Sequence, residues 1–287
     1  MGAYSRSIVS GNRKLEETIG ERCFKLDNKT IIAEGKGGVI TYAQLVEALK
    51  KAGINQGDTI CVHSDLTKFG KNKLPRTEYL QSYIDAFREV LGEEGILIMP
   101  TFSYSFCNGE EYNVQTTKST VGVLTEYFRK CPEVVRTRDP IFSFAIHGRE
   151  IEQYRDIGEA CFSRDSMYGK LVDNKAKIIF LGGKRGCFTF NHFLESIMKV
   201  PYRFMKRFEG IVIDGDNKYQ TYRDYYVRHL NQNSIQSVEI MSAFLEEKGI
   251  INTVEIGDAT ISCIECEAWY NAAVVQYKKN PYYFLQS

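Results

Sequence analysis

Residues 177–195 read KIIFLGGKRGCFTFNHFLE. The apolar run at 177–181, closed by two glycines, is typical of a buried strand that ends in a turn. The aromatic segment after it has a helical pattern, with His192 near its start and Glu195 three residues further on. Residues three apart on a helix share a face, so these two side chains can meet. The stretch therefore predicts a strand, a glycine turn and a helix that carries a histidine and a carboxylate side by side.

The same alternation continues on both sides of this stretch. Strands are predicted at 58–66, 95–102 and 134–148 (broken by Pro140), and helices at 40–53, 77–92 and 120–131. Further along, the patterns indicate a hairpin over 208–230 with an Asp-Gly turn at 214–215, a helix at 237–249, β-structure at 251–270 and a closing helix at 268–280. Strands that alternate with helices indicate an α/β core with both sheet faces covered. We expect one domain over 1–287, with an α/β core up to residue 200 and a β-rich part at 201–287 packed on it.

Composition and charge exclude several classes of partner. The 287 residues are 43% hydrophobic, and 37 basic against 36 acidic residues leave a formal net charge of +1. A net charge this small creates no long-range electrostatic attraction to nucleic acid or to an anionic membrane surface. The N-terminal MGAYSRSIVSGNRKLEE has no apolar stretch of signal-peptide length, and no window approaches the roughly 20 apolar residues of a bilayer span. We expect a cytoplasmic protein without nucleic-acid or membrane partners, and a homodimer is left open.

The cysteines indicate free thiols and no metal site. Eight are spread along the chain, several of them in apolar runs. Cys263 and Cys266 have the spacing of a metal or redox pair, but zinc needs about four ligands and the chain offers no second such pair. The surrounding segment also alternates like a strand, in which residues three apart point to opposite faces. We therefore expect a structural role for both and no metal in the protein.

Polar residues gather where predicted strands end and helices begin. The segments in question are VHSDLTKFG, MPTFSYS, KSTVGVLTE and GGKRGCFTFNH. In open α/β sheets ligands bind at such ends, because free N–H groups and helix dipoles point there. The glycine clusters match neither a P-loop nor a dinucleotide fingerprint, which argues against the usual nucleotide-binding folds.

Five segments in order carry a family resemblance. VHSDLTKFG, LIMPTFSYS, STVGVLTEYFRKCPEVVRTRDPIFSFAIHG, SMYGKL and KIIFLGGKRGCFTFNHFLE together resemble the aminoglycoside 3-N-acetyltransferase family, over about residues 40 to 210. The resemblance implies an α/β/α layered sandwich with a central mixed sheet. It also implies transfer of an acyl group from acetyl-CoA or another acyl-CoA to an amine.

The reaction explains the histidine and the carboxylate. An alkyl amine is mostly protonated at neutral pH, so a base must remove its proton before it attacks a thioester. His192 is the predicted base, at the place where the family keeps its histidine, and Glu195 would orient its ring or bind the amine. Without the family, a histidine packed between Phe190 and Phe193 beside a solvated Glu195 explains the pattern as well.

The resemblance also implies a coenzyme site at the strand ends. The predicted coenzyme residues are His63, Ser64, Asp65, Leu66, Thr101, Phe102, Ser103, Ser119, Thr120, Val121 and Gly122. Residues 63–66 would meet the pantetheine arm of the coenzyme, and residues 101–103 would line the channel that holds this arm. The third would bind phosphate through a helix N-terminus. Ser119 and Thr120 could equally well cap that helix, and capping and binding are compatible.

Two departures from the family concern the acceptor. Asp139, the third predicted catalytic residue, stands where aminoglycoside-modifying members carry the histidine of a His-Pro pair. It would bind an ammonium or hydroxyls, or be held by Arg136 or Arg138. The stretch from 202 to 228 is dense in tyrosine and arginine. We predict acceptor contacts at Asn191, Tyr202, Arg203 and Arg228, although a hairpin with solvated arginines explains the composition too.

These departures order the functional hypotheses. The leading one is an N-acyltransferase acting on an amino sugar, nucleotide-linked and destined for a surface polysaccharide. The alternatives are an aminoglycoside 3-N-acetyltransferase that confers antibiotic resistance, and a non-catalytic member of the fold that binds a coenzyme or a sugar.

Overall fold

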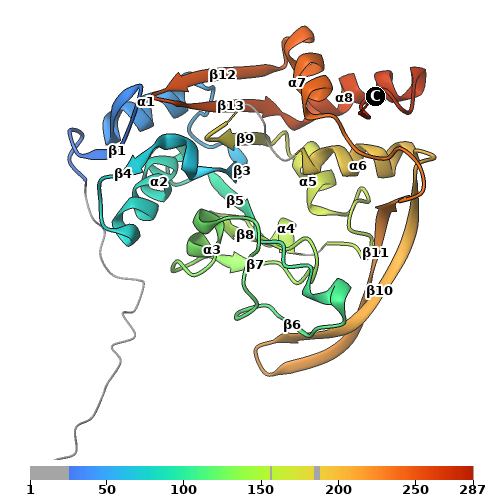
Figure 1. Cartoon of the computed structure of the whole chain (residues 1–287). Helices are drawn as coiled ribbons and strands as arrows, with labels where there is room; N and C mark the ends of the chain where they lie inside the picture. The colour runs from blue at the N-terminus through green and yellow to red at the C-terminus, as the bar shows by residue number, and fades with distance from the viewer. Residues whose placement is uncertain (1–25, 156, 184–187, 287) are drawn as a thin grey trace, which may run out of the picture.

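The computed structural model describes residues 26–155, 157–183 and 188–286 (Figure 1). Its centre is a seven-stranded mixed sheet in the order β12-β13-β9-β3-β5-β8-β7. The parallel strands are β3 (Thr59–Ser64), β5 (Ile96–Pro100) and β9 (Lys177–Leu181). The antiparallel strands at the two sides are β7 (Val135–Arg136), β8 (Phe144–His147), β12 (Ile251–Ile256) and β13 (Ala259–Glu265).

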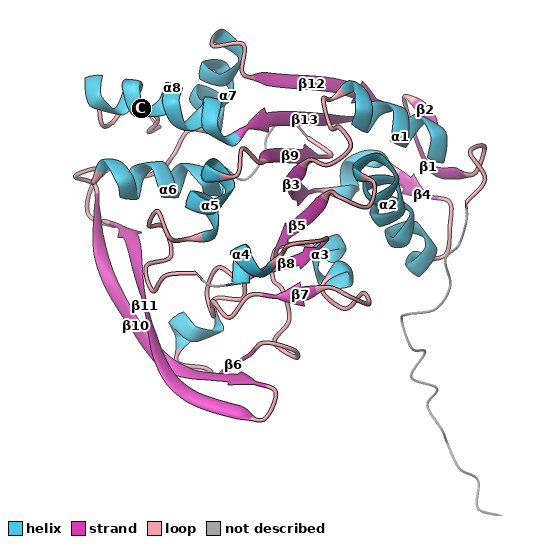
Figure 2. Cartoon of the chain, turned by 180° about the vertical axis from the view of Figure 1, so that it is seen from behind, coloured by secondary structure: helices cyan, strands magenta, loops and turns pink. Residues whose placement is uncertain are grey.

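Helices cover both faces of this sheet, as Figures 1 and 2 show. One layer holds α1 (Tyr42–Lys51), α2 (Arg76–Leu91) and α3 (Val123–Phe128). The other holds α5 (Met167–Asp173), α6 (Thr189–Met198), α7 (Val238–Glu247) and α8 (Cys266–Lys279). Side chains of a strand point alternately to the two faces of the sheet. In β3, Cys61 packs on the side covered by α5–α8 and Val62 on the side covered by α1–α3. The predicted α/β/α architecture with a mixed sheet is confirmed.

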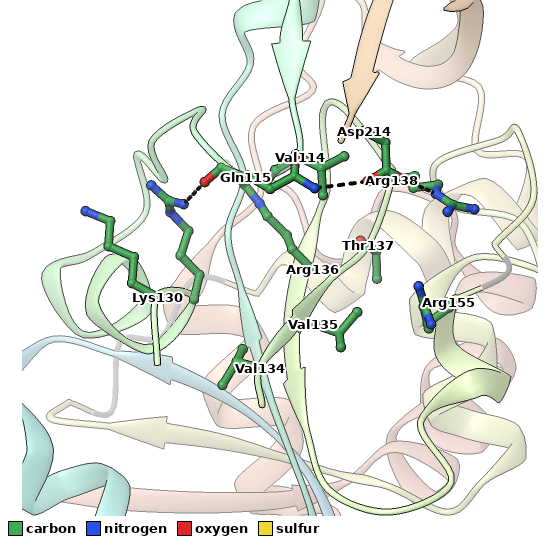
Figure 3. A pocket seen from close by; sticks show the side chains of 11 residues that line it. Val114, Gln115, Lys130, Val134, Val135, Arg136, Thr137, Arg138, Arg155 and Asp214 are labelled. Carbon is green, nitrogen blue, oxygen red and sulfur yellow. Dashed lines mark hydrogen bonds and ion pairs between the residues drawn. The ribbon is translucent and has the colours of Figure 1, made fainter. Parts of the chain in front are cut away.

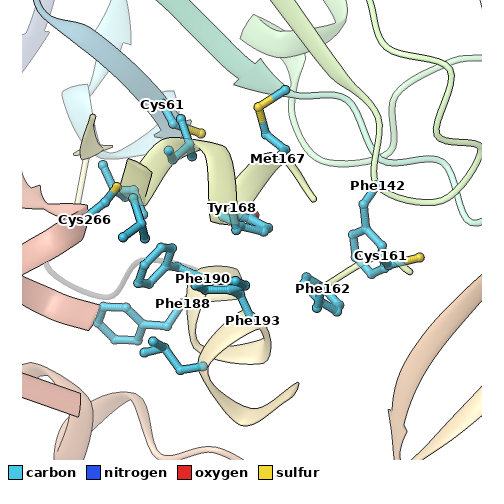
Figure 4. Close-up of a cluster of buried hydrophobic side chains, with 14 of the residues drawn as sticks. Cys61, Phe142, Cys161, Phe162, Met167, Tyr168, Phe188, Phe190, Phe193 and Cys266 are labelled. Atoms are coloured by element: carbon cyan, nitrogen blue, oxygen red, sulfur yellow. The ribbon is translucent and has the colours of Figure 1, made fainter. Parts of the chain in front are cut away.

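Aromatic packing decides which side of α6 faces outward. Phe188 and Phe190 contact the Trp269 ring with centroid distances of 5.6 and 4.7 Å. Phe193 is buried with them between the sheet and the helices (Figure 4). Because these rings form the apolar side of the helix, His192 is left on the side that reaches solvent.

A long two-stranded hairpin lies beside the layered core. It consists of β10 (Arg203–Asp214) and β11 (Asn217–Arg228), and β6 (Tyr112–Asn113) pairs with its far end. In Figures 1 and 2 the hairpin curves along one side of the molecule. Asp214 pairs with Asn217, so the turn is Gly215-Asp216, one residue later than predicted. Gly215 has a φ of 59°, and glycine at the first turn position is typical of tight hairpins.

The remaining elements are short. A small sheet in the order β2-β1-β4 is formed by β1 (Ile31–Gly35), β2 (Gly38–Thr41) and β4 (Lys71–Asn72). Helical turns occur at η1 (Leu66–Phe69), η2 (Ser105–Asn108) and α4 (Glu152–Arg155). Within the described ranges, none of the helices is long and apolar enough to cross a bilayer.

Two local expectations are corrected. Ser119 and Thr120 do not cap α3, which begins at Val123 after Gly122. The Thr120 N–H and Oγ1 instead donate to the carbonyl of Phe102, at 2.9 and 3.0 Å, which keeps this residue out of the helix.

The cysteine pair is the second correction. Cys263 lies in β13, but Cys266 begins α8, so the strand pattern holds for only one of them. Both are buried free thiols, and burial raises the pKa of Cys263 to about 12. A thiol that stays protonated is a poor ligand and a poor nucleophile, which agrees with the structural role.

Candidate active site

The helix α6 brings His192 and Glu195 together as predicted. His192 Nδ1 lies 2.8 Å from Glu195 Oε2. The Glu195 side chain is fully buried, whereas 24% of the His192 side chain is exposed. One member of the pair is therefore fixed inside the protein and the other can reach a ligand.

Glu195 is held by groups from three other positions. The Tyr202 hydroxyl donates to Oε1 at 3.0 Å, and Gln236 Nε2 donates to Oε2 at 2.9 Å. Arg203 Nε forms an ion pair with Oε2 at 2.7 Å, and its side chain is almost entirely buried. A buried carboxylate needs such partners because desolvation of an unpaired charge is costly. These contacts fix the oxygen that faces His192.

His192 Nδ1 lies among one hydrogen-bond acceptor and two donors. Glu195 Oε2, Arg203 Nη2 and Gln236 Nε2 all lie within 3.0 Å of it. Only the carboxylate oxygen can accept a hydrogen bond, since guanidinium and amide nitrogens only donate. With the proton on Nδ1 and donated to Glu195, the lone pair of Nε2 is free to take a proton. The carboxylate favours this tautomer, whereas the two nitrogen donors favour a lone pair on Nδ1.

A cavity of about 680 Å³ opens next to His192. It is lined by His192, Arg203, Phe204, Lys206, Phe208, Tyr225, Val227, Arg228, Leu230, Ser234, Ile235 and Gln236. Of the predicted acceptor residues, Arg203 and Arg228 line it. Asn191 and Tyr202 are buried behind it, where Asn191 accepts from the Tyr277 hydroxyl at 2.9 Å. Gln236 was missed, since it lies in a loop without a motif and reaches His192 only through folding.

Asp139 is placed apart from this cavity. Its carboxylate is buried, and Oδ1 accepts the N–H groups of Ile141 and Phe142 at 2.8 and 2.9 Å. Its nearest cation is Arg223, whose Nε lies 3.8 Å from Oδ2. Asp139 therefore stabilises the turn at Pro140, and its catalytic role remains only a prediction.

Neither arginine proposed as the partner of Asp139 holds it. Arg136 donates to the carbonyl of Thr101 at 2.7 Å, and Arg138 pairs with Asp214 at 2.6 Å. The tight turn at Pro140 directs both neighbouring arginines elsewhere, and the hairpin supplies the cation instead.

The three predicted coenzyme segments meet at one edge of the sheet. β3 and β5 are neighbouring parallel strands. Ser64 at the end of β3 and Thr101 just after β5 therefore lie at the same edge of the sheet. Thr120 is bonded to Phe102, and a Cβ placed on Gly122 would lie 3.8 Å from the Ser64 carbonyl oxygen. The segments at 63–66, 101–103 and 119–122 are thus brought together in space.

Several side chains of these segments already have protein partners. Thr101 Oγ1 lies 2.9 Å from Ser143 Oγ, and Ser103 donates to the carbonyl of Pro140 at 3.1 Å. Asp65 Oδ1 accepts the Thr67 N–H at 3.1 Å and so caps η1, and the Ser119 N–H donates to Glu126 at 2.8 Å.

The other coenzyme residues are placed as follows. Leu66 and Phe102 are buried in the cores, and Val121 is half-buried before α3. His63 packs on Phe180, and burial lowers its pKa to about 4. Asp65 and Thr120 are exposed, and His63, Ser64 and Ser119 are half-buried. Contacts of all these residues with a coenzyme remain predictions.

A second cavity, of about 510 Å³, is lined by both residues of β7 and by side chains of the surrounding loops (Figure 3). Its cations each have a partner: Arg129 and Lys130 share Glu126, Arg138 pairs with Asp214, Arg155 pairs with Glu152, and Arg136 donates to backbone carbonyls. These charges hold the loops around the cavity. In the described ranges no group of three or more His, Cys, Asp or Glu is arranged to hold a metal ion.

The fold is that of solved aminoglycoside acetyltransferase structures. A sequence model of the aminoglycoside 3-N-acetyltransferase family matches residues 61–278, and the chain belongs to this family. It is an acyl-CoA-dependent N-acyltransferase.

Two curated relatives are similar over most of the chain. One is the SPbeta prophage-derived aminoglycoside N(3')-acetyltransferase-like protein YokD of Bacillus subtilis strain 168, which is 26% identical over an alignment of 213 residues. The alignment covers 66% of this chain and 76% of YokD. The other is aminoglycoside N(3)-acetyltransferase IV of a Salmonella species, 26% identical over 247 residues, 85% of this chain and 89% of the relative.

Solved structures share the fold. The apoenzyme of aminoglycoside acetyltransferase AAC(3)-IVa has a TM-score of 0.70 at 24% identity, covering 86% of this chain and 91% of its own. AAC-IIIb in a binary complex with CoASH has a TM-score of 0.71 at 20% identity, covering 84% and 97%. AAC-VIa bound to sisomicin has a TM-score of 0.72 at 15% identity, covering 84% and 98%.

Proposed function

We propose that the chain transfers an acetyl group from acetyl-CoA to a primary amine of an amino sugar, with His192 as the general base. The observation that carries this proposal is the contact of His192 with the buried Glu195, beside a cavity large enough for a sugar. The burial of Glu195 argues against the packing explanation of His192, in which this carboxylate is solvated.

The proposed steps follow from this geometry. His192 Nε2 takes a proton from the ammonium or from the attacking amine, and the amine nitrogen bonds to the thioester carbonyl carbon. The carbon–sulfur bond then breaks, and the coenzyme leaves as a thiolate that takes up a proton. Glu195 stabilises the imidazolium that forms in between. The coenzyme would approach from the segments at 63–66, 101–103 and 119–122.

The comparisons bear on the choice of acceptor. The curated relatives are named aminoglycoside N(3)-acetyltransferases, and the AAC-VIa neighbour holds sisomicin. These names support an aminoglycoside acceptor, as in antibiotic resistance. They give no support to a nucleotide-linked sugar of surface polysaccharide biosynthesis, so the antibiotic hypothesis is the better supported of the two.

Release of free coenzyme A tests the proposal. We expect acetyl-CoA-dependent thiol release with at least one amino sugar, and we expect His192→Gln to lower turnover by roughly 100-fold or more. Acetyl-CoA affinity should stay nearly unchanged, because the base acts on the amine. Near-normal turnover of the variant would assign His192 a packing role.

A further inference from the structure

Tyr104 follows the strand end at 101–103 and has an unfavourable backbone conformation. Its φ and ψ are 58° and 1°, in the left-handed region. Glycine adopts this region freely and asparagine adopts it at a small cost, whereas a bulky aromatic residue is sterically disfavoured there. The chain therefore holds Tyr104 under a local strain that a smaller residue would relieve.

The turn at Tyr104 does not explain why the residue is aromatic. Among the described residues other than glycine, positive φ values also occur at Glu133, Glu150, Lys175 and Lys199. All four are charged, and the two lysines lie at the ends of α5 and α6, where left-handed residues are common. Tyr104 instead begins η2, and its carbonyl accepts the N–H of Cys107 at 3.0 Å. Asparagine or glycine would form the same turn.

The ring of Tyr104 reaches solvent from a segment that is otherwise buried. Its exposed fraction is 39%, whereas residues 101–103 and 105–106 are each 8% exposed or less. The ring meets Phe142 edge-on, with centroids 5.8 Å apart. Backbone strain at a residue with an exposed ring, beside a candidate active site, indicates a ring kept for a ligand.

Neighbouring rings connect Tyr104 to the cavity and to His192. Phe142 packs on Tyr225, which lines the cavity, with centroids 5.0 Å apart. Phe142 also packs on Phe162 at 4.6 Å, and Phe162 meets the His192 ring at 5.7 Å (Figure 4). Three successive ring contacts therefore separate Tyr104 from the proposed base. An acceptor of several sugar rings can span this separation, whereas a single sugar at His192 cannot.

We propose that Tyr104 is a specificity-determining residue whose ring packs against a part of the acceptor distant from the amine that is acetylated. This inference rests on the proposed function, since it extends the acceptor site beyond the cavity at His192. The face of an aromatic ring packs on the apolar side of a sugar and attracts ammonium groups. An aminoglycoside has both features, so the contact favours it over a single amino-sugar ring.

Acceptors of different length test this assignment. The single-ring amine 2-deoxystreptamine, and sisomicin, which contains this ring together with two further sugars, are supplied with acetyl-CoA. We expect Tyr104→Asn to lower kcat/KM for sisomicin by on the order of 10-fold, mainly through KM, and to leave 2-deoxystreptamine nearly unaffected. Tyr104→Phe keeps the ring and should retain the wild-type values for both. A loss in Tyr104→Phe as large as in Tyr104→Asn would overturn the ring contact.

Thermal unfolding separates binding from packing. Because asparagine tolerates the left-handed backbone, Tyr104→Asn should leave the melting temperature unchanged or raise it while kcat/KM for sisomicin falls. Lys175→Asn is the matched control: its φ is 51°, and it should leave kcat/KM unchanged for both acceptors. A lower melting temperature of Tyr104→Asn, together with equal losses on both acceptors, would show that the ring only supports Phe142 and would overturn the inference.

Two further measurements separate this inference from the proposed function. A raised KM for acetyl-CoA in Tyr104→Asn, with KM for sisomicin unchanged, would place the ring at the coenzyme and refute its assignment to the acceptor. If neither amine is acetylated, the proposed function fails, and calorimetry with coenzyme A present still tests the ring. Weaker binding of sisomicin to Tyr104→Asn than to the wild type upholds the inference, and equal or absent binding refutes it.

Discussion

His192 is oriented by side chains from three separate segments. Glu195 lies on α6, Arg203 begins β10, and Gln236 precedes α7. Arg203 has two roles in this arrangement, because it neutralises Glu195 and also forms part of the cavity wall. A substitution of Arg203 would therefore disturb the contacts of His192 and the wall of the cavity at once.

His63 gives a pH-dependent test at the residue scale. Burial lowers its pKa to about 4, against about 6.5 in the unfolded chain. Between these values the unfolded state binds a proton that the folded state does not, so the free energy of unfolding falls as pH decreases from 6.5 to 4. We expect His63→Gln to reduce this pH dependence by more than about 1 kcal/mol.

Urea unfolding at pH 7 and pH 4.5 measures this effect. His229→Gln, at an imidazole that lies against Phe204 near the cavity, serves as the matched control. If wild type and His63→Gln lose the same stability between the two pH values, the imidazole of His63 is not desolvated in the folded protein.

The predictability of the site differs from residue to residue. His192 and Glu195 were found because both lie on one helix at a spacing that dictates contact. Gln236 lies 41 residues from Glu195, and nothing in its local sequence indicates where the chain brings it. Tyr202 and Asn191 were expected at the acceptor, but burial depends on packing that a local pattern of polar residues does not reveal.

At the scale of elements, the hairpin is docked through a glycine. A Cβ on Gly210 would lie 2.7 Å from Cε2 of the buried Phe106 ring on η2. No real side chain fits at this distance without movement, so the absence of a side chain lets β10 approach the core. The same strand carries Lys206 into the cavity.

We expect Gly210→Val to destabilise the protein by about 1–3 kcal/mol through overpacking, although valine is the better strand former. The displaced strand should also raise KM for the acceptor. Thermal unfolding and steady-state kinetics measure the two effects, with Thr221→Val on the opposite strand as the control. An unchanged melting temperature and KM would show that Phe106 moves aside freely.

Element boundaries were predictable where burial sets the sequence pattern. The apolar runs of β3, β5 and β9 follow from burial between the two helix layers, and the helical spacing in α1, α2 and α6 follows from packing of one face on the sheet. The start of α3 was not predictable, because Thr120 is held by the carbonyl of Phe102, just after β5, rather than by its own helix. The hairpin turn was one residue off, since Asp-Gly and Gly-Asp both fit a tight turn locally.

At the scale of the whole molecule, the proposed coenzyme and acceptor sites lie on different parts of the fold. The predicted coenzyme segments lie at the carboxyl ends of the central strands, and the proposed acceptor cavity lies between α6 and the hairpin. The order of elements and the two-sided packing were predictable, because strands that alternate with helices form this architecture. The curved path of the hairpin was not, since a strand pattern contains no information about where a free hairpin docks.

The side chains around His192 come from α6, β10 and the loop before α7. Turnover should therefore be lost when the hairpin separates from α6, before the central sheet unfolds. The arrangement exists only while β10 and the loop before α7 rest against α6, and docked peripheral elements open at lower free energy than a buried sheet. In a urea titration we expect turnover to vanish at a lower concentration than the circular dichroism of the central sheet. A saturating acceptor should move the first midpoint toward the second, because it binds only the closed form. Coincident midpoints without acceptor would mean that hairpin and sheet melt as one cooperative unit.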